Sequence, residues 1–214
     1  MNKMKTLVLG SALAASTVAT NVAVAGASAN IGYTSDYFFR GIYQTTSSAS
    51  AGLDYDFGNG FGVGVWAADV DDGIEYDLYG SFGGEVGDLG YSIGFTQYNY
   101  TDDWDGTYEE VNLGLSYGPL SVDYADGTYE PVGGGESDYS FVSVTLEHKG
   151  AYVTFGDFGK DAAGSYTELG YGMEVGGFDV GVAIINNDED LDNRSGDLDG
   201  ETAMTLSLSK SFDL

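Results

Sequence analysis

Carboxylates are the side chains with the greatest capacity for chemistry in this sequence. Its 214 residues contain 34 Asp and Glu against seven Lys and Arg, one His and no Cys, so that the formal net charge is −27. Such a charge excludes nucleic-acid binding, because that binding depends on Lys and Arg contacts to phosphate. The lack of Cys excludes disulfides, a Cys-ligated metal and a lipid anchor on Cys. The chemistry open to the chain is therefore electrostatic, namely attraction of cations and repulsion of anions.

A catalytic arrangement of these residues is not apparent. A hydrolase needs Ser or another nucleophile held against a His base, and the one histidine, His148, follows the apolar register of Val144 and Leu146 beside a turn. The glycines follow a strand period and precede no helix, so they do not form a phosphate-binding loop. The sequence therefore predicts no enzymatic activity and no cofactor.

The first 25 residues have the features of a secretory signal peptide. Two lysines precede an apolar stretch at 7–18, and small residues then offer cleavage sites after Ala25 or Ala29. The mature chain keeps five basic and 34 acidic residues, which gives a net charge of −29. No later apolar run approaches the ~18–20 residues of a membrane helix. A mature chain that spans a membrane must therefore do so with strands, and we expect a single domain over 30–214.

Apolar and polar residues alternate through the mature chain with the period of two that predicts β-strands. The segments 74–82, 110–117, 178–185 and 204–209 show this alternation most clearly. Tight turns recur every 27 to 31 residues, with one longer polar connection between consecutive turns. The turns are predicted at 58–60, 87–88, 118–119, 149–150 and 176–177, and the longer connections near 43–47, 69–73, 101–107, 126–138, 158–164 and 187–201.

This strict alternation of short and long connections predicts an all-β fold, an antiparallel up-and-down transmembrane β-barrel of the outer-membrane type. Five turns and six longer connections join twelve strands, and strands of ~10 residues leave ~65 residues for the connections. Ten or fourteen strands are the alternatives, since each strand pattern is weak. A soluble periplasmic β-sandwich would alternate too, but it would not need 17 Tyr and 11 Phe, which can form aromatic girdles at the membrane interfaces.

In such a barrel the apolar face of each strand meets lipid and the other face lines the lumen. The predicted inner face combines Gly, Ser and Thr with acidic residues and a single arginine. Its glycines either leave open space or only ease the coiling of the strands. The candidate lumen-lining residues are Asp36, Arg40, Asp54, Glu75, Asp77, Asp123, Glu147, Glu168, Glu174 and Asp179.

Arg40 is the one mature basic residue expected at membrane depth, where it points inward with Asp36. We predict that it neutralises lumen carboxylates, which otherwise repel one another, and the alternative is a constriction or a contact with solute. Nineteen other acidic residues fall in the outer connections, seven of them within 187–201. They predict either a solvated charged rim or weak binding of divalent cations, although 188–201 does not fit the EF-hand pattern.

The segment 35–42, with the sequence SDYFFRGI, resembles the opening motif of the TorF family of proteobacterial porins. The similarity covers 30–117 well and the rest of the chain by pattern only. It implies an outer-membrane barrel with a porin role, and it implies no particular solute. Many barrels end on an aromatic residue, whereas here Phe212 is followed by two further residues. The other similar segments are 52–55, 62–67, 75–80, 98–100 and 108–110.

Two functions fit these expectations. The first is a narrow passive channel of the bacterial outer membrane for small hydrophilic solutes, favouring cations or neutral molecules because lumen carboxylates attract cations and repel anions. The second is a non-conducting barrel with a structural or surface-interaction role, which a lumen filled by large interlocking side chains would favour. Either barrel would contact outer-membrane lipid and lipopolysaccharide, the latter through divalent cations at the acidic loops. The sequence predicts no particular oligomeric state.

Overall fold

The computed structural model describes residues 25–196 and 198–214. The predicted signal peptide, apart from Ala25, lies outside the described residues. All elements of the described part are β-strands. Within it, no helix has the length and apolar character needed to cross a membrane.

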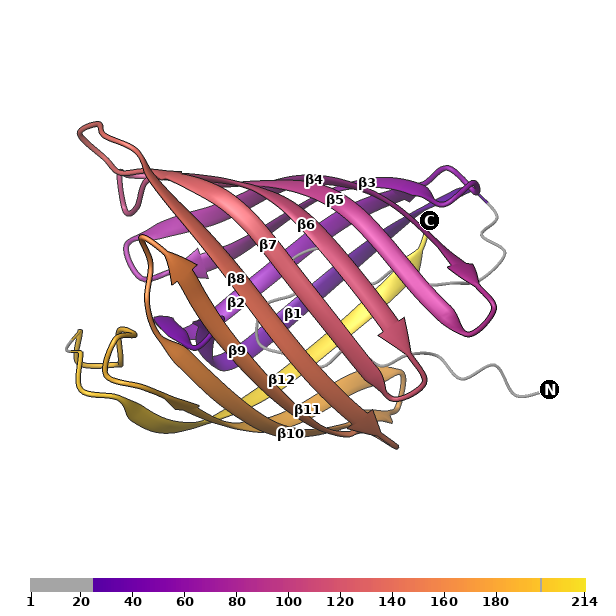
Figure 1. The fold of residues 1–214 in the computed structure, drawn as a ribbon. Coiled ribbons are helices and arrows are strands. Elements are labelled where there is room, and N and C mark those ends of the chain that lie inside the picture. The colour runs from indigo at the N-terminus through magenta and orange to yellow at the C-terminus, as the bar shows by residue number, and fades with distance from the viewer. Residues whose placement is uncertain (1–24, 197) are drawn as a thin grey trace.

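Twelve antiparallel strands close into a barrel (Figure 1), which confirms the predicted fold and strand number. Each strand pairs with its neighbours in sequence, and β1 pairs with β12 to complete the ring. The β-sandwich alternative is wrong, because the sheet closes on itself. The strands are β1 (Gly26–Phe39), β2 (Ile42–Asp56), β3 (Phe61–Val70), β4 (Gly73–Val86), β5 (Leu89–Tyr100), β6 (Thr107–Tyr117), β7 (Leu120–Glu130), β8 (Ser137–His148), β9 (Ala151–Lys160), β10 (Ser165–Val175), β11 (Phe178–Asn187) and β12 (Glu201–Asp213).

The two ends of the barrel differ in their connections. The five predicted tight turns all join strands, and they lie at the end that also holds the C-terminus (Figure 1), which we call the turn end. The opposite end, which we call the loop end, carries the longest connections, 131–136 and 188–200. Short turns mark the periplasmic end of outer-membrane barrels.

The prediction of a long connection at 43–47 is wrong, because these residues belong to β2 and the hairpin reverses at Arg40–Gly41. Strict alternation is wrong as well, since only two residues join β3 to β4. The polar composition of 43–47 resembles that of a loop, but Thr45 and nearby Ser48 are buried on the inner face of β2. Polar side chains are expected on the inner face of a barrel strand. The polar composition of 43–47 therefore does not by itself indicate a turn.

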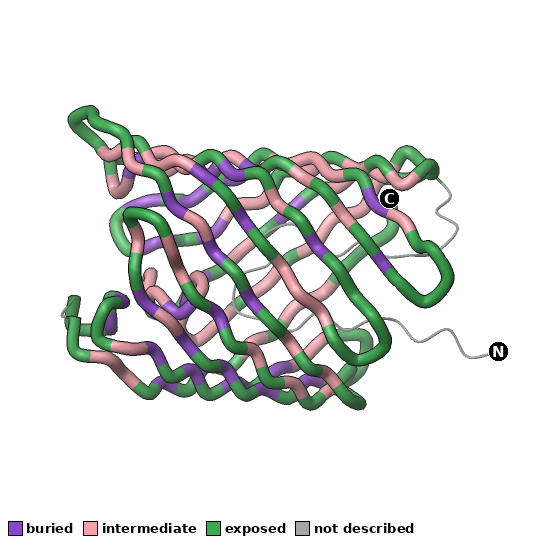
Figure 2. The backbone as a smooth tube through the Cα atoms, in the orientation of Figure 1, coloured by how far each residue is buried: buried purple, intermediate pink, exposed green. Residues whose placement is uncertain are grey.

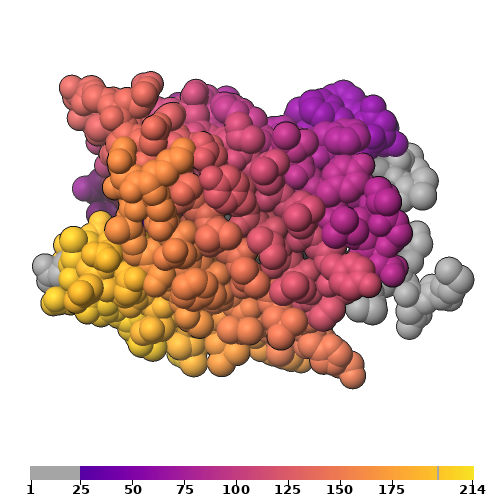
Figure 3. All heavy atoms as spheres, viewed as in Figure 1, coloured from indigo at the N-terminus to yellow at the C-terminus, as the bar shows by residue number. Residues whose placement is uncertain are grey.

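Exposed and less exposed residues alternate along the strands (Figure 2). In β6, for example, Leu113 and Leu115 are 45% and 54% exposed, whereas Gly114 between them is buried. Side chains of neighbouring strands cover the side of the barrel seen in Figure 3. Large apolar side chains such as Leu113 and Leu115 are exposed along the strands. A soluble monomer rarely exposes so much apolar surface, so the outer face of the barrel fits the hydrocarbon of a bilayer. His148 is exposed at the turn end, as its register predicted.

Candidate functional site in the barrel lumen

The end of the first hairpin enters the barrel. β1 has a bulge between Tyr37 and Phe38, and the chain reverses at Arg40 and Gly41, whose φ angles are +50° and +82°. A bulge bends a strand, and both Tyr37 and Phe38 are buried. We call residues 37–42 the tip. Its indigo end lies within the outline of the barrel at the loop end (Figure 1), and its contacts with the opposite wall place it in the lumen.

Phe38 joins the tip to the far wall. The strands β7 and β8 lie across the ring from β1, and both contribute to the buried cluster that contains Phe38. Full burial of a Phe side chain stabilises by about 1.5–3 kcal/mol, so this cluster favours a tip that stays inside. The other buried members are Ala125, Phe141, Tyr166, Ile185, Leu191 and Ala203.

Gly41 allows the tip to approach the wall closely. A Cβ atom at this position would lie 2.6 Å from the Cβ of Tyr166 on β10, and the positive φ also favours glycine. The Gly41 carbonyl accepts a hydrogen bond from Asn187 Nδ2 at 2.9 Å. The Tyr43 N–H donates to the carbonyl of Asp192 at 3.1 Å. These contacts fasten the tip to β10, to β11 and to the loop between β11 and β12.

The opposite side of the tip packs against β3, β4 and β5. Tyr37 shares a second buried cluster with Ala68 and Val70, and its hydroxyl donates to Glu75 Oε1 at 2.8 Å. The Phe39 ring meets the Tyr98 ring edge to face, with centroids 5.3 Å apart. The tip therefore crosses the lumen near the loop end and contacts both sides of the ring.

Arg40 at the end of the tip reaches Glu110 on β6. Its Nη1 donates to Oε1 at 2.5 Å and its Nη2 donates to Oε2 at 3.0 Å, which makes a bidentate ion pair. The Glu110 side chain is fully buried and that of Arg40 is 13% exposed. The Arg40 Cζ lies 4.8 Å from the Phe39 ring centroid and 4.4 Å from that of Phe141. Charge-assisted bidentate contacts are among the strong hydrogen bonds, so this pair holds the tip against β6.

Three neutral donors complete the surroundings of Glu110. The Tyr139 hydroxyl donates to Oε1 at 2.8 Å, and Asn112 Nδ2 and the Tyr98 hydroxyl donate to Oε2 at 2.7 and 3.3 Å. A buried carboxylate needs both an opposite charge and hydrogen bonds to offset its lost hydration. Glu110 has both, which makes it the best-satisfied charge in the loop-end half of the lumen.

The sequence predicts that Asp36 points inward together with Arg40, but the ion-pair partner of Asp36 is a different arginine. Its Oδ1 pairs with Arg194 Nη2 of the last loop at 3.1 Å, and Arg194 also approaches Glu201 at 3.5 Å. Arg40 itself occupies the turn rather than a strand. The bulge before it changes the direction of the side chains, which period-two counting from Asp36 cannot anticipate.

Glu75 and Asp77 lie on the same face of β4, and both are buried. Glu75 accepts the hydrogen bond from Tyr37. Asp77 lies opposite Trp66 on β3 and Tyr98 on β5 in the strand register. Among the described residues, its Oδ1 is a buried polar atom without a hydrogen-bond partner. Asp77 is therefore buried next to the tip without the full set of hydrogen bonds that Glu110 receives.

The turn-end half of the lumen is lined by small and polar side chains. Asp54 on β2 accepts hydrogen bonds from Asn30 at 3.3 Å and from the Tyr79 hydroxyl at 2.6 Å. Nearer the loop end, Glu168 on β10 accepts one from the Tyr152 hydroxyl. The structure also places Asp123 on the inner face of β7, and it places Glu147, Glu174 and Asp179 near the turn-end rim.

Aromatic rings, not open space, lie against two of the inward glycines. Gly64 and Gly170 lie directly opposite Tyr79 and Tyr152 in the strand register, and a Cβ atom at either glycine would collide with the tyrosine ring. Each tyrosine is thus laid flat over a glycine, where its hydroxyl reaches Asp54 or Glu168. The expectation that inward glycines leave open space is wrong at these two positions.

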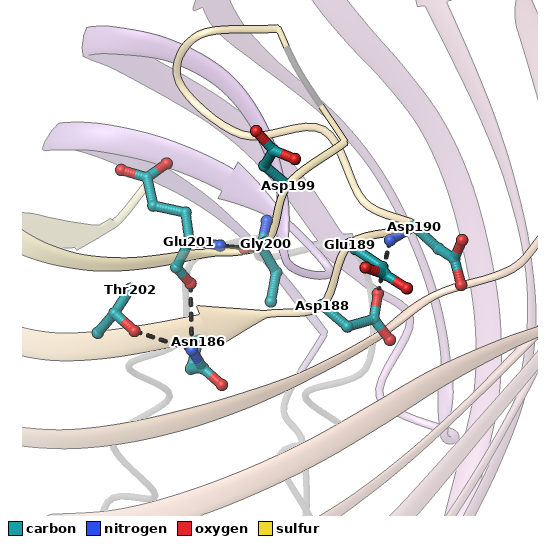
Figure 4. A pocket seen from close by; sticks show the side chains of 9 residues that line it. Asn186, Asp188, Glu189, Asp190, Asp199, Gly200, Glu201 and Thr202 are labelled. Carbon is teal, nitrogen blue, oxygen red and sulfur yellow. Dashed lines mark hydrogen bonds between the residues drawn. The ribbon is translucent and has the colours of Figure 1, made fainter.

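The acidic loop between β11 and β12 frames an open hollow of about 540 Å³ at the loop end (Figure 4). Asp188 does not face it as a free ligand, because its carboxylate accepts hydrogen bonds from the Ser165 N–H and hydroxyl at 2.7 Å and from the Asp190 N–H at 3.1 Å. No group of three or more His, Cys, Asp or Glu in the described ranges could hold a metal ion. Divalent cation binding at this loop stays a prediction.

Glu110 is the main lumen residue that sequence reasoning missed. It lies on the same face as Asn112 and Gly114, so period-two counting from that inward pair could have identified it. Phe38, Tyr98 and Phe141 could not have been identified in this way, because their roles depend on contacts between strands far apart in sequence.

Comparisons with known proteins agree with a barrel of this kind. A family model described as "Bacterial protein of unknown function (Gcw_chp)" matches residues 18–212. No curated protein sequence matches the chain. The resemblance to the TorF family stays a prediction, since the matching model carries a different name.

Among solved structures, the KdgM porin is 11% identical, with a TM-score of 0.58 over 86% of this chain and 99% of that one. The same values hold for the KdgM porin in complex with disordered oligogalacturonate. A structure from a study of the in-meso crystallization of membrane proteins is 8% identical, with a TM-score of 0.60 over 88% of this chain and 84% of the other. At these identities the similarity shows the fold alone, a closed antiparallel β-barrel.

Proposed function

We propose that this chain, which belongs to the Gcw_chp family of bacterial proteins of unknown function, is an outer-membrane channel for small hydrophilic solutes. The observation that carries the proposal is a closed twelve-strand barrel with an apolar outer face and a lumen of carboxylates, hydroxyls and glycines. Polar linings of this kind support diffusion of hydrated solutes. The role is passage of solute, and no residue is assigned a catalytic step.

The charge of the lumen supports a preference for cationic or neutral solutes. Glu110 is paired with Arg40, and carboxylates that have no ion-pair partner among the described residues, such as Asp54, Glu147 and Glu174, line the lumen toward the turn end. A low-dielectric cavity with excess negative charge raises the local concentration of cations and lowers that of anions. The oligogalacturonate of the KdgM complex is an anionic chain, which a lumen with excess negative charge would repel.

Electrical recording tests whether the barrel conducts. The folded protein, identified by heat-modifiable migration on a gel, would be inserted into planar lipid bilayers. We expect small and infrequent single-channel openings, because the tip crosses the loop-end half of the lumen. A folded preparation that never conducts, even after the tip is loosened by Glu110→Gln, contradicts the proposal.

A second candidate is a non-conducting barrel with a structural or surface-interaction role, and the tip that crosses the loop-end half of the lumen favours it. In this case the outward-facing carboxylates near the loop end would meet lipopolysaccharide through divalent cations. Asp69, Asp126, Asp138 and Asp157 are exposed there, with Lys160 paired to Asp126 at 2.8 Å. Silent bilayers for both the wild type and Glu110→Gln, together with binding to lipopolysaccharide that chelation of Mg²⁺ abolishes, would establish this second role.

A further inference from the structure

A cage on the lumen wall surrounds the Arg40 guanidinium. Five wall residues form this cage, and they come from β5, β6 and β8 rather than from the tip. Glu110 supplies two acceptor oxygens, and the Phe141 ring covers one face of the guanidinium at 4.4 Å. Tyr98, Asn112 and Tyr139 hold the carboxylate by donating to it. Every group that recognises the guanidinium, apart from the Phe39 ring, would stay in place if Arg40 left.

The cage has the geometry that distinguishes a guanidinium from an ammonium group. Two parallel N–H donors of one planar fork match the two oxygens of a carboxylate, whereas an ammonium group binds as a point charge. The Phe141 ring adds a cation–π interaction, which is favourable for a planar, weakly hydrated guanidinium group.

We infer that the Glu110 cage is a binding site for solutes that carry a guanidinium group, and that Arg40 is its resident occupant. A solute of this class that enters from the loop end competes with Arg40 for Glu110, and by displacing it releases the tip. The inference deepens the proposed channel function. Its consequence for transport, release of the tip by the solute, rests on that function. Binding to the cage itself does not require that the barrel conducts.

Arg40 competes as an intramolecular ligand. A tethered group acts at an effective concentration that is commonly in the millimolar range or above, so a free guanidinium compound must reach at least that concentration to displace it. Removal of the Arg40 side chain abolishes this competition. Glycine is the suitable replacement, because position 40 has a φ of +50° that glycine adopts without strain.

The test uses methylguanidinium chloride and the thermal unfolding of the Arg40→Gly variant in detergent, followed by loss of the heat-modifiable folded form. Sodium chloride and methylammonium chloride at equal ionic strength are the controls. At ten times its dissociation constant, methylguanidinium should raise the unfolding temperature by roughly 3–6 °C. Methylammonium should give a clearly smaller shift. If Arg40→Gly fails to fold, Arg40→Asn replaces it, since Asn also tolerates a positive φ.

The matched control is the double variant Arg40→Gly with Glu110→Gln, in which the shift should disappear. A shift that persists in the double variant, or one that methylammonium reproduces, overturns the inference. So does the absence of a shift beyond that of sodium chloride. Because the readout is stability, a barrel that binds methylguanidinium without conducting contradicts the channel proposal and leaves the cage supported.

Discussion

Replacement of Glu110 by Gln should release the tip from the wall. The substitution keeps the shape of the side chain but removes the charge that faces Arg40 at 2.5 and 3.0 Å. Loss of one partner from a buried ion pair costs about 3–5 kcal/mol. Arg40 is 13% exposed and reaches water more readily than a fully buried group, so we expect the lower end, about 3 kcal/mol. This corresponds to a rise of roughly 150-fold in the population of released tips.

Single-channel recording measures this change as open probability, and Glu109→Gln provides the matched control. Glu109 immediately precedes Glu110 on β6, it faces outward, and its carboxylate accepts a hydrogen bond from Gln97 at 2.8 Å. The Glu109→Gln change should leave the open probability within a factor of about two of the wild-type value, because surface contacts contribute under about 1 kcal/mol. Equal open probability and equal thermal stability of the two variants would refute the conclusion that Arg40 and Glu110 hold the tip.

Three further outcomes follow from the described contacts. Asp77→Asn should leave the free energy of unfolding in urea within about 1 kcal/mol of the wild type, because the Asp77 Oδ1 makes no hydrogen bond that the change could break; Asp54→Asn, which disturbs two hydrogen bonds, should destabilise the barrel by more, and the opposite order would contradict this account. Gly41→Ala should lower the unfolding temperature more than Gly87→Ala, since both have positive φ but only Gly41 abuts Tyr166. The mature protein should begin at Gly26, because residues 26–29 pair with β2; mass spectrometry showing cleavage after Ala29 would disprove this.

The faces of the strands and the tight turns could be predicted from the sequence because both are local. A period of two reports which side of a strand a residue occupies, and turn glycines such as Gly87 and Gly176 adopt positive φ in the structure. On this basis the alternation predicts an inner face for carboxylates such as Glu75 and Asp77.

The tip could not be predicted in the same way. A single bulge at Tyr37 and Phe38 breaks the register, and a bulge leaves no distinct mark in the residue pattern. The choice of Glu110 as the partner of Arg40 depends on bringing β6 across the ring from the first hairpin. The two partners are 70 residues apart in sequence. They come together only when the twelve strands close into a barrel.

The sign of the zero-current potential across a tenfold KCl gradient tests the central claim most directly. Passage through a lumen with excess carboxylates predicts that the dilute side becomes positive, approaching but not reaching the limit of about 59 mV for an ideal cation channel. Glu110→Gln, with its released tip, should give more frequent openings and keep the same sign. A dilute side that becomes negative would show anion preference and contradict the account.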